Sequence, residues 1–83
     1  MKYTSNVIYN KIVTILVNDF QQDISVLSLD TNLIKDLDFD SLDCADLYAK
    51  LEESLKLKER VHILEVIKLR TIEDVINLVM KLQ

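Results

Sequence analysis

Leu37-Asp38-Phe39-Asp40-Ser41-Leu42-Asp43 is the stretch from which the fold can be worked out. Asp40 is a favourable N-cap residue, and three positions later Asp43 supplies the acid that completes a capping arrangement. We therefore predict a helix that begins at Asp40 or Ser41 and runs to about Leu55. The Ser41 hydroxyl then lies at the start of this helix, between two carboxylates.

The predicted helix has faces of different character. Apolar side chains at helical spacing are expected to face the core: Cys44, Leu47, Tyr48, Leu51 and Leu55. Charged side chains fall on another side: Asp43, Asp46, Lys50 and Glu53. A smaller apolar strip lies beside Ser41 and consists of Leu42, Ala45 and Ala49. Because acids surround this strip, it is a candidate docking face for a partner.

Two further segments have clear helical periodicity. The first covers residues 6–20 and directs these side chains inward: Ile8, Ile12, Ile15, Leu16 and Phe20. Its candidate caps are Thr4, Ser5 and Asn6. The last begins at Thr71, with Asp74 as its capping acid. Its inward side chains are expected to be Ile72, Val75, Ile76, Val79 and Leu82.

The segments between these helices are irregular. Residues 21–40 form a long connection whose apolar residues follow no clean period: Ile24, Leu27, Leu29, Leu33 and Leu37. We expect an ordered loop that those side chains pin to the core, and loops this long in compact domains are usually functional. In residues 56–70, a short third helix could use Val61, Leu64 and Ile67. Val66 and Leu69 are also expected to be buried.

The composition favours a small all-α fold. The 83 residues suffice for one domain, residues 1–83, and 49% of them are hydrophobic. The absence of Gly and Pro removes the usual turn formers and excludes glycine-rich phosphate loops. Cys44 is the only cysteine, so an internal disulfide and a Cys/His zinc cluster are excluded. We predict a four-helix bundle with a long loop after the first helix and a short third helix.

Charge is unevenly distributed along the chain. From Asp30 to Glu53, eight acids and two bases give a net charge of −6; from Lys56 to Arg70, five bases and two acids give +3. An acidic patch favours basic protein partners over nucleic acid, and a solvated surface without a partner is the alternative. No apolar run reaches the length of a membrane span, and the N-terminus lacks a signal-peptide pattern. We therefore expect a cytoplasmic protein, with an equivalent organelle compartment after removal of a transit peptide as the alternative.

Ser41 lacks the companions that a catalytic serine needs. His62 is the only histidine, and no glycine is present to build a nucleophile elbow. Cys44 is interpreted as a small core residue, with a reactive thiol near a helix N-terminus as the alternative. We therefore expect no catalytic residue, and a Ser41 that another enzyme modifies.

The acids before Ser41 also fail to form a calcium loop. Asp36, Asp38 and Asp40 match the first three ligand positions of an EF-hand. The sixth position, however, is Ser41 instead of Gly, and the twelfth is Leu47 instead of Glu. We therefore expect no metal site.

Together these residues closely resemble the acyl carrier proteins. That family's signature is Asp-Ser-Leu at the start of the second helix of a four-helix bundle, usually preceded by Asp-Leu-Gly and a variable residue. Here Asp36-Leu37-Asp38-Phe39 precede Asp40-Ser41-Leu42-Asp43. The resemblance also covers the first-helix core, the loop anchors Leu27 and Leu33, the second-helix residues Leu47, Leu51, Glu52 and Glu53, and the opening of the last helix, Thr71-Ile72-Glu73-Asp74.

The resemblance implies a non-catalytic carrier. Ser41 would bear a 4′-phosphopantetheine arm, attached by a phosphopantetheinyl transferase, and the arm's thiol would hold acyl groups for fatty acid or related lipid or polyketide synthesis. The docking surface for basic patches on synthases and acyl-transferring enzymes would comprise Asp40, Leu42, Asp43, Ala45, Asp46, Glu52 and Glu53. The protein would act as a monomer. Aminoacyl or D-alanyl cargo, and a small helical interaction module that is never modified, are the alternatives.

Two features depart from the family pattern. Asp38 stands where the family usually has Gly; if this position needs a positive φ, Asp tolerates it better than most residues. Between Glu53 and Thr71 the chain is about two residues longer than usual, and it is basic where typical members are acidic. These departures favour a specialised carrier with its own partners.

Overall fold

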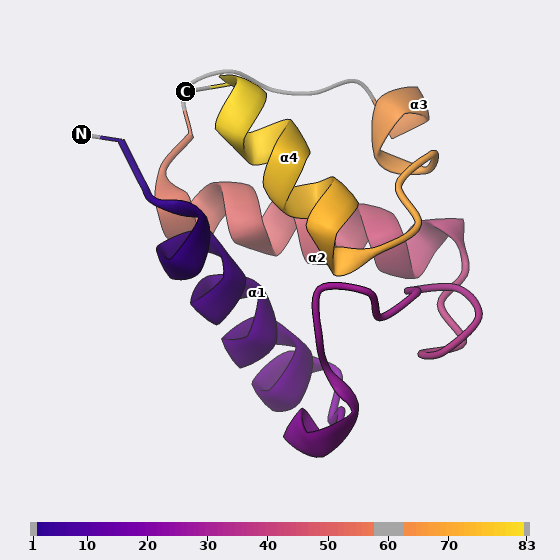
Figure 1. Ribbon diagram of the computed structural model, residues 1–83. Helices are drawn as coiled ribbons and strands as arrows, with labels where there is room; N and C mark the ends of the chain where they lie inside the picture. Colours follow the sequence, from indigo (N-terminus) through magenta and orange to yellow (C-terminus); the bar gives the residue numbers. More distant parts are fainter. Residues whose placement is uncertain (1, 58–62, 83) are drawn as a thin grey trace.

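The computed structural model describes residues 2–57 and 63–82. Within these ranges the chain forms four α-helices and one 3-10 turn, without a β-strand (Figure 1). Their bounds are α1 Ser5–Asp19, η1 Ile24–Val26, α2 Ser41–Leu55, α3 Ile63–Val66 and α4 Ile72–Leu82. This confirms the predicted small helical bundle, with its long loop between α1 and α2 and its short α3. None of the described helices has the length and apolar character that crossing a membrane requires.

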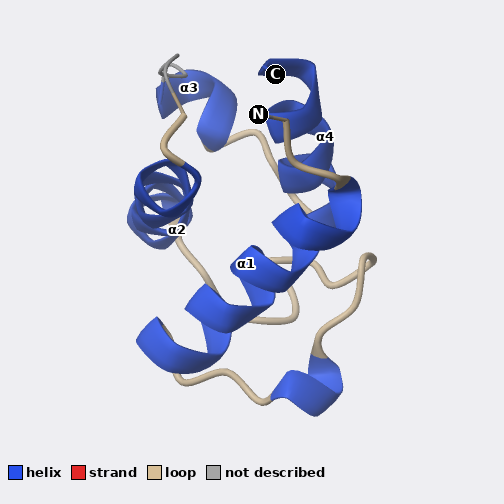
Figure 2. Cartoon of the chain, turned by 90° about the vertical axis from the view of Figure 1, so that its left-hand side faces the viewer, coloured by secondary structure: helices blue, strands red, loops and turns tan. Residues whose placement is uncertain are grey.

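The hydrophobic core lies between the three longer helices. Helix α1 packs against both α2 and α4, while α3 contacts α2; Figure 2 shows α2 nearly end-on beside α1. The most completely buried side chains come from these helices and the long loop: Ile8, Ile12, Leu16, Leu33, Leu47, Leu51, Leu55, Ile72, Val75 and Val79. All five side chains predicted to face inward from α2 are buried, so that face is confirmed.

Helix α1 begins one residue earlier than predicted. The Val7 N–H donates to Thr4 Oγ1 over 3.3 Å, which identifies Thr4 as the N-cap among the three candidates. Its buried residues are Ile8, Ile12, Val13, Ile15 and Leu16, of which only Val13 was not predicted. Phe20 follows the helix and is half-buried.

The loop between α1 and α2 is tied to the start of α4 by main-chain hydrogen bonds. The Leu33 N–H donates to the Arg70 carbonyl over 2.7 Å, and the Ile72 N–H donates to the Thr31 carbonyl over 3.1 Å. Leu33 and Leu37 are buried and Leu27 is half-buried, as predicted. These bonds satisfy backbone groups that would otherwise be unpaired inside an irregular segment.

Two of the predicted loop anchors are wrong. Ile24 is 66% exposed and Leu29 44% exposed. Ile24 lies in η1, a single 3-10 turn at one end of the molecule (Figure 1), and none of the three residues of this turn is buried. Phe39, which was not predicted as an anchor, is buried and packs its ring 5.0 Å from that of Phe20.

The segment that leads into α4 only partly follows the prediction. Helix α3 is a single turn in which Val66 is buried as predicted, whereas Leu64 is 56% exposed. Leu64 was expected on an inward face, but a one-turn helix buries only the side that touches α2. Val61 and His62 lie outside the described residues.

The start of α4 follows its sequence signal. The Asp74 N–H donates to Thr71 Oγ1, and the Thr71 N–H donates to Asp74 Oδ2, both over 3.1 Å. Four inward residues of α4 are buried, and Leu82 is half-buried. Thr71 and Asp74 therefore cap the helix as predicted.

Candidate functional site

A reciprocal capping box sets the start of α2. The Asp43 N–H donates to Asp40 Oδ1 over 2.9 Å, and the Asp40 N–H donates to Asp43 Oδ2 over 3.2 Å. Each side chain thus satisfies a backbone donor that the first turn of a helix cannot satisfy itself. The two carboxylates beside Ser41 are therefore committed to holding the helix end, as predicted.

Ser41 is the first residue of α2, and its side chain is exposed. Its hydroxyl makes no hydrogen bond to any residue in ranges 2–57 and 63–82. The backbone N–H groups of Ser41 and Leu42 also lack an acceptor within the described part of the chain. A free hydroxyl thus lies next to two free amides at the positive end of a helix dipole.

The residues before α2 alternate between the core and solvent. Leu37 and Phe39 are buried, at 7% and 6% exposure, while Asp38 and Asp40 are exposed. The Phe39 N–H donates to the Leu33 carbonyl over 3.0 Å, so this approach is fixed to the loop that docks on α4. Two buried anchors therefore hold the backbone directly before Ser41. The alternation of apolar and acidic residues in 37–40 was visible in the sequence, and it could have identified Phe39.

Asp38 adopts φ of 61°, in the left-handed region. Asp38 therefore adopts the positive φ that a glycine, usual at this position in the family that the chain resembles, would adopt freely. Asp and Asn are the non-glycine residues that enter this region most readily. The exposed Asp38 carboxylate adds a negative charge close to the start of α2.

Asn32 organises the turn that leads to this approach. Its side-chain Oδ1 accepts from the N–H groups of Ile34 and Lys35, over 3.0 and 2.9 Å. In return, Asp36 Oδ2 accepts from the Asn32 N–H over 2.7 Å. Asn32 was not predicted from the sequence because a single Asn gives no periodic signal, although Asn is a residue that typically builds such turns.

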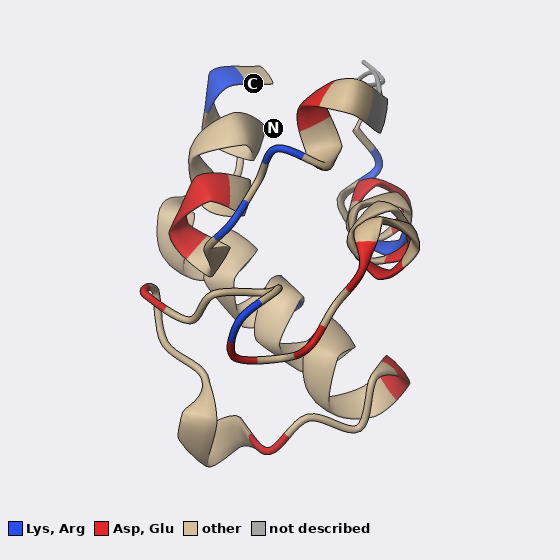
Figure 3. Cartoon of the chain, turned by 90° about the vertical axis from the view of Figure 1, so that its right-hand side faces the viewer, with Lys and Arg blue, Asp and Glu red and all other residues tan. Residues whose placement is uncertain are grey.

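The predicted docking residues occupy the first turns and the far end of α2. Leu42 is 75% exposed, Ala45 is half-buried, and Asp40, Asp46 and Glu53 are exposed. Asp43 is half-buried within the capping box. Figure 3 shows acidic residues along α2 and on the loop that precedes it. Asp46 forms an i,i+4 ion pair with Lys50, with 3.7 Å between Oδ1 and Nζ.

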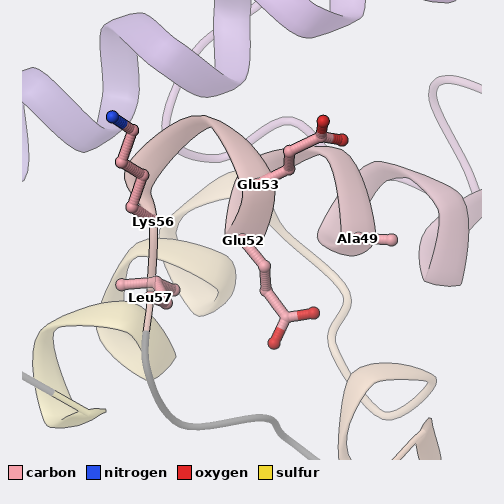
Figure 4. A pocket seen from close by; sticks show the side chains of 5 residues that line it. All are labelled: Ala49, Glu52, Glu53, Lys56 and Leu57. Atoms are coloured by element: carbon pink, nitrogen blue, oxygen red, sulfur yellow. The ribbon is translucent and has the colours of Figure 1, made fainter.

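Glu52 differs from the other predicted docking acids. Figure 4 shows its carboxylate pointing to the side of α2 opposite that of Glu53. Its Oε2 atom is buried, and no hydrogen-bond partner for it exists among the described residues. Glu52 and Glu53 line the same pocket, but their carboxylates point to different sides of α2.

Cys44 is buried and carries a free thiol. Burial, followed by the negative charge of Asp43, raises the pKa of this thiol, and the positive charge of Arg70 only partly opposes the rise. The thiol is therefore protonated near neutral pH. This supports the core interpretation of Cys44 and contradicts the alternative of a reactive thiol with a lowered pKa.

Comparison with known proteins identifies the family. The sequence model of the phosphopantetheine attachment site matches residues 10–79. Since this match covers most of the 83 residues, the chain belongs to the phosphopantetheine attachment site family. Members of this family are carriers with a covalently attached 4′-phosphopantetheine group, and they are not catalytic enzymes. A search of curated proteins found no match.

The chemistry at the start of α2 fits such a group. An exposed hydroxyl can form the ester with phosphorus, and free N–H groups at a helix N-terminus favour a bound phosphate. The acids of the capping box oppose the phosphate charge, but each is already engaged by a backbone N–H. Ser41 is therefore the candidate attachment residue.

Proposed function

We propose that the chain is a single acyl carrier domain, with the 4′-phosphopantetheine arm attached to Ser41. The observation that carries this proposal is the exposed, unbonded Ser41 hydroxyl on the first turn of α2, beside two free amides. When bound, the arm supplies a terminal thiol that holds an acyl group as a thioester. The chain's own residues only have to present the hydroxyl and stabilise the phosphate.

The chain acts in this proposal as the substrate of a phosphopantetheinyl transferase. The Ser41 oxygen attacks the phosphorus of coenzyme A that bears the pantetheine. An oxygen–phosphorus bond to Ser41 forms, and the diphosphate bond breaks to release adenosine 3′,5′-bisphosphate. The hydroxyl proton goes to a base that the transferase supplies, which suits a serine whose neighbouring acids are engaged in capping.

The acids of α2 and the exposed Leu42 form the proposed docking surface. Its members are Asp40, Leu42, Asp43, Ala45, Asp46, Glu52 and Glu53. Basic patches on the transferase, synthases and acyl-transferring enzymes are the complementary partners. Exposed charges accelerate association more than they strengthen the complex, and a carrier must leave each partner after delivery. Glu52 is the member that the geometry supports least, because its Oε2 is buried.

The proposed cargo is an acyl group for fatty acid or related lipid or polyketide synthesis in the cytoplasm. Acidic residues on α2 suit the partners of such pathways. Asp38 and the basic residues between Lys56 and Arg70 favour a specialised carrier over the general fatty acid carrier.

Intact-mass measurement tests the attachment. The purified protein is incubated with coenzyme A and a broad-range transferase. We expect a mass increase of one phosphopantetheine, which is absent in Ser41→Ala. Ser54→Ala is the matched control, since Ser54 is also exposed on α2, and it should be modified like the wild type. If no transferase modifies the wild type, the unmodified interaction module is the correct interpretation.

A further inference from the structure

Two buried polar atoms on α2 lack partners. Tyr48 is only 3% exposed, and its hydroxyl makes no hydrogen bond within the described part of the chain. Glu52 Oε2 is buried and equally unpaired. One atom is a hydrogen-bond donor and the other is an acceptor when ionised. The two residues are one helical turn apart, so their side chains lie on the same side of α2.

Such atoms need an explanation, because most buried polar side chains in folded proteins have a partner. Tyr48 and Glu52 are near enough to interact electrostatically: burial first, and then the Glu52 and Glu65 carboxylates, raise the pKa of Tyr48 to about 12. Even so, the Tyr48 hydroxyl and Glu52 Oε2 do not form a hydrogen bond. A donor and an acceptor on the same side of α2 are thus both buried without a hydrogen-bond partner among the described residues.

A pocket adjoins Glu52, whereas Tyr48 is not among the residues that line it. It has a volume of about 400 Å³ and is lined by Ala49, Glu52, Glu53, Lys56 and Leu57. In Figure 4 the Glu52 carboxylate extends from the helix on the side away from Glu53. The volume is more than ten times the ~30 Å³ that a water molecule occupies in the liquid. An organic group, and not only a solvent molecule, therefore fits beside Glu52.

The positions along α2 match the dimensions of the arm. At ~1.5 Å of helix rise per residue, Tyr48 lies about 10 Å from Ser41 along the axis, and Glu52 about 16 Å. In an extended peptide, three consecutive bonds span ~3.5 Å. At the same spacing, the distal amide of an extended phosphopantetheine arm lies roughly 11 Å from phosphorus, and the sulfur lies roughly 15 Å from phosphorus. Along the helix axis, an arm lying on α2 therefore places its amide at the level of Tyr48, and the first carbons of its cargo at the level of Glu52.

We infer that Tyr48 and Glu52 select an acyl cargo that carries a hydrogen-bond donor, a hydroxyl or an ammonium group, within a few bonds of the thioester. The Tyr48 hydroxyl donates to the distal amide carbonyl of the arm, and Glu52 accepts from the donor on the cargo. A plain alkyl chain would leave Glu52 Oε2 unpaired. This inference rests on the proposed attachment of the arm to Ser41.

The test compares cargoes of equal length. The transferase loads the protein from hexanoyl-, 3-hydroxyhexanoyl- or 3-aminohexanoyl-coenzyme A, and adenosine 3′,5′-bisphosphate is released. The melting temperature is then measured for each loaded form. In the wild type, a cargo with a donor should raise the melting temperature above that of the hexanoyl form by several degrees. Comparison of the 3-hydroxy and 3-amino cargoes shows whether a hydroxyl or an ammonium group is the preferred donor.

Substitutions identify the residues that read the cargo. Tyr48→Phe and Glu52→Met should each reduce the difference between the polar and plain cargoes. In the unloaded protein, Tyr48→Phe should melt no lower than the wild type, because it removes a hydroxyl that has no partner. Lys50→Met is the control: it also replaces a long charged side chain on α2, and the cargo difference should persist.

The outcomes separate this inference from the proposed function. Failure to load Ser41 would refute the carrier assignment itself. Normal loading with equal melting temperatures for the three cargoes would overturn only the cargo preference. A lower melting temperature of unloaded Tyr48→Phe would also overturn it, since the hydroxyl would then already be bonded.

Discussion

Removal of the Asp40 side chain should destabilise the protein through the helix end and not through lost surface charge. In Asp40→Ala, the Asp43 N–H loses the acceptor that it contacts at 2.9 Å. Loss of an N-cap costs ~1 kcal/mol, within a range of ~0.5–2 kcal/mol. For a domain of this size, 1 kcal/mol corresponds to a drop of ~4–8 °C in melting temperature.

Two variants separate capping from charge. Asn caps helices about as well as Asp, so Asp40→Asn should keep most of the stability while losing the same charge. Asp46→Ala also removes an acid from α2, but it breaks only an exposed ion pair, worth at most ~0.5 kcal/mol. The assay is thermal unfolding followed by circular dichroism. If Asp40→Asn is as destabilising as Asp40→Ala, or if Asp40→Ala melts like the wild type, the capping explanation is refuted.

Three further predictions follow from burial. Phe39→Ala should lower the free energy of unfolding, measured by urea titration, by ~3–5 kcal/mol, because Phe39 is buried. Leu42 is 75% exposed, so Leu42→Ala should change the free energy of unfolding by less than ~0.5 kcal/mol. Similar effects of the two substitutions would contradict the role of Phe39 as a buried anchor. The pKa of Tyr48 is raised to about 12 from 10.0, so between these pH values the folded protein keeps a phenol proton that the unfolded chain releases. The free energy of unfolding should therefore fall as pH rises from 10 to 12, and Tyr48→Phe should lack the part of this fall that is due to the phenol. An identical decline in both proteins would exclude a contribution from Tyr48. Cys44 should react slowly with iodoacetamide in the native protein and rapidly in urea, as followed by mass; fast native alkylation would contradict its burial.

The sequence was most informative where local chemistry and packing gave the same signal. In α2, the capping acids and the apolar period agreed, and the structure confirmed both the start near Ser41 and all five inward residues. The cap at Thr71 and Asp74 was recognised for the same reason. The place of Ser41 at the start of α2 followed directly from the position of Asp40.

The irregular segments could not be predicted in the same way. Whether Ile24 or Leu29 is buried depends on how the loop meets α1 and α4, and this arrangement is fixed by tertiary hydrogen bonds such as that from Leu33 to Arg70. A linear pattern carries no record of such contacts. The unpaired polar atoms of Tyr48 and Glu52 could not be predicted either. From the sequence, Tyr48 was an ordinary core residue and Glu52 an ordinary surface acid.

Peptide mapping of protein isolated from its native host tests the central claim most directly. Cleavage after Lys35 and Lys50 releases residues 36–50, in which Ser41 is the only serine or threonine. After reduction, which removes any disulfide adduct at Cys44, this peptide should carry one phosphopantetheine, with fragment ions that place it on Ser41. The same peptide recovered only in unmodified form, or modified at another residue, would contradict the carrier assignment.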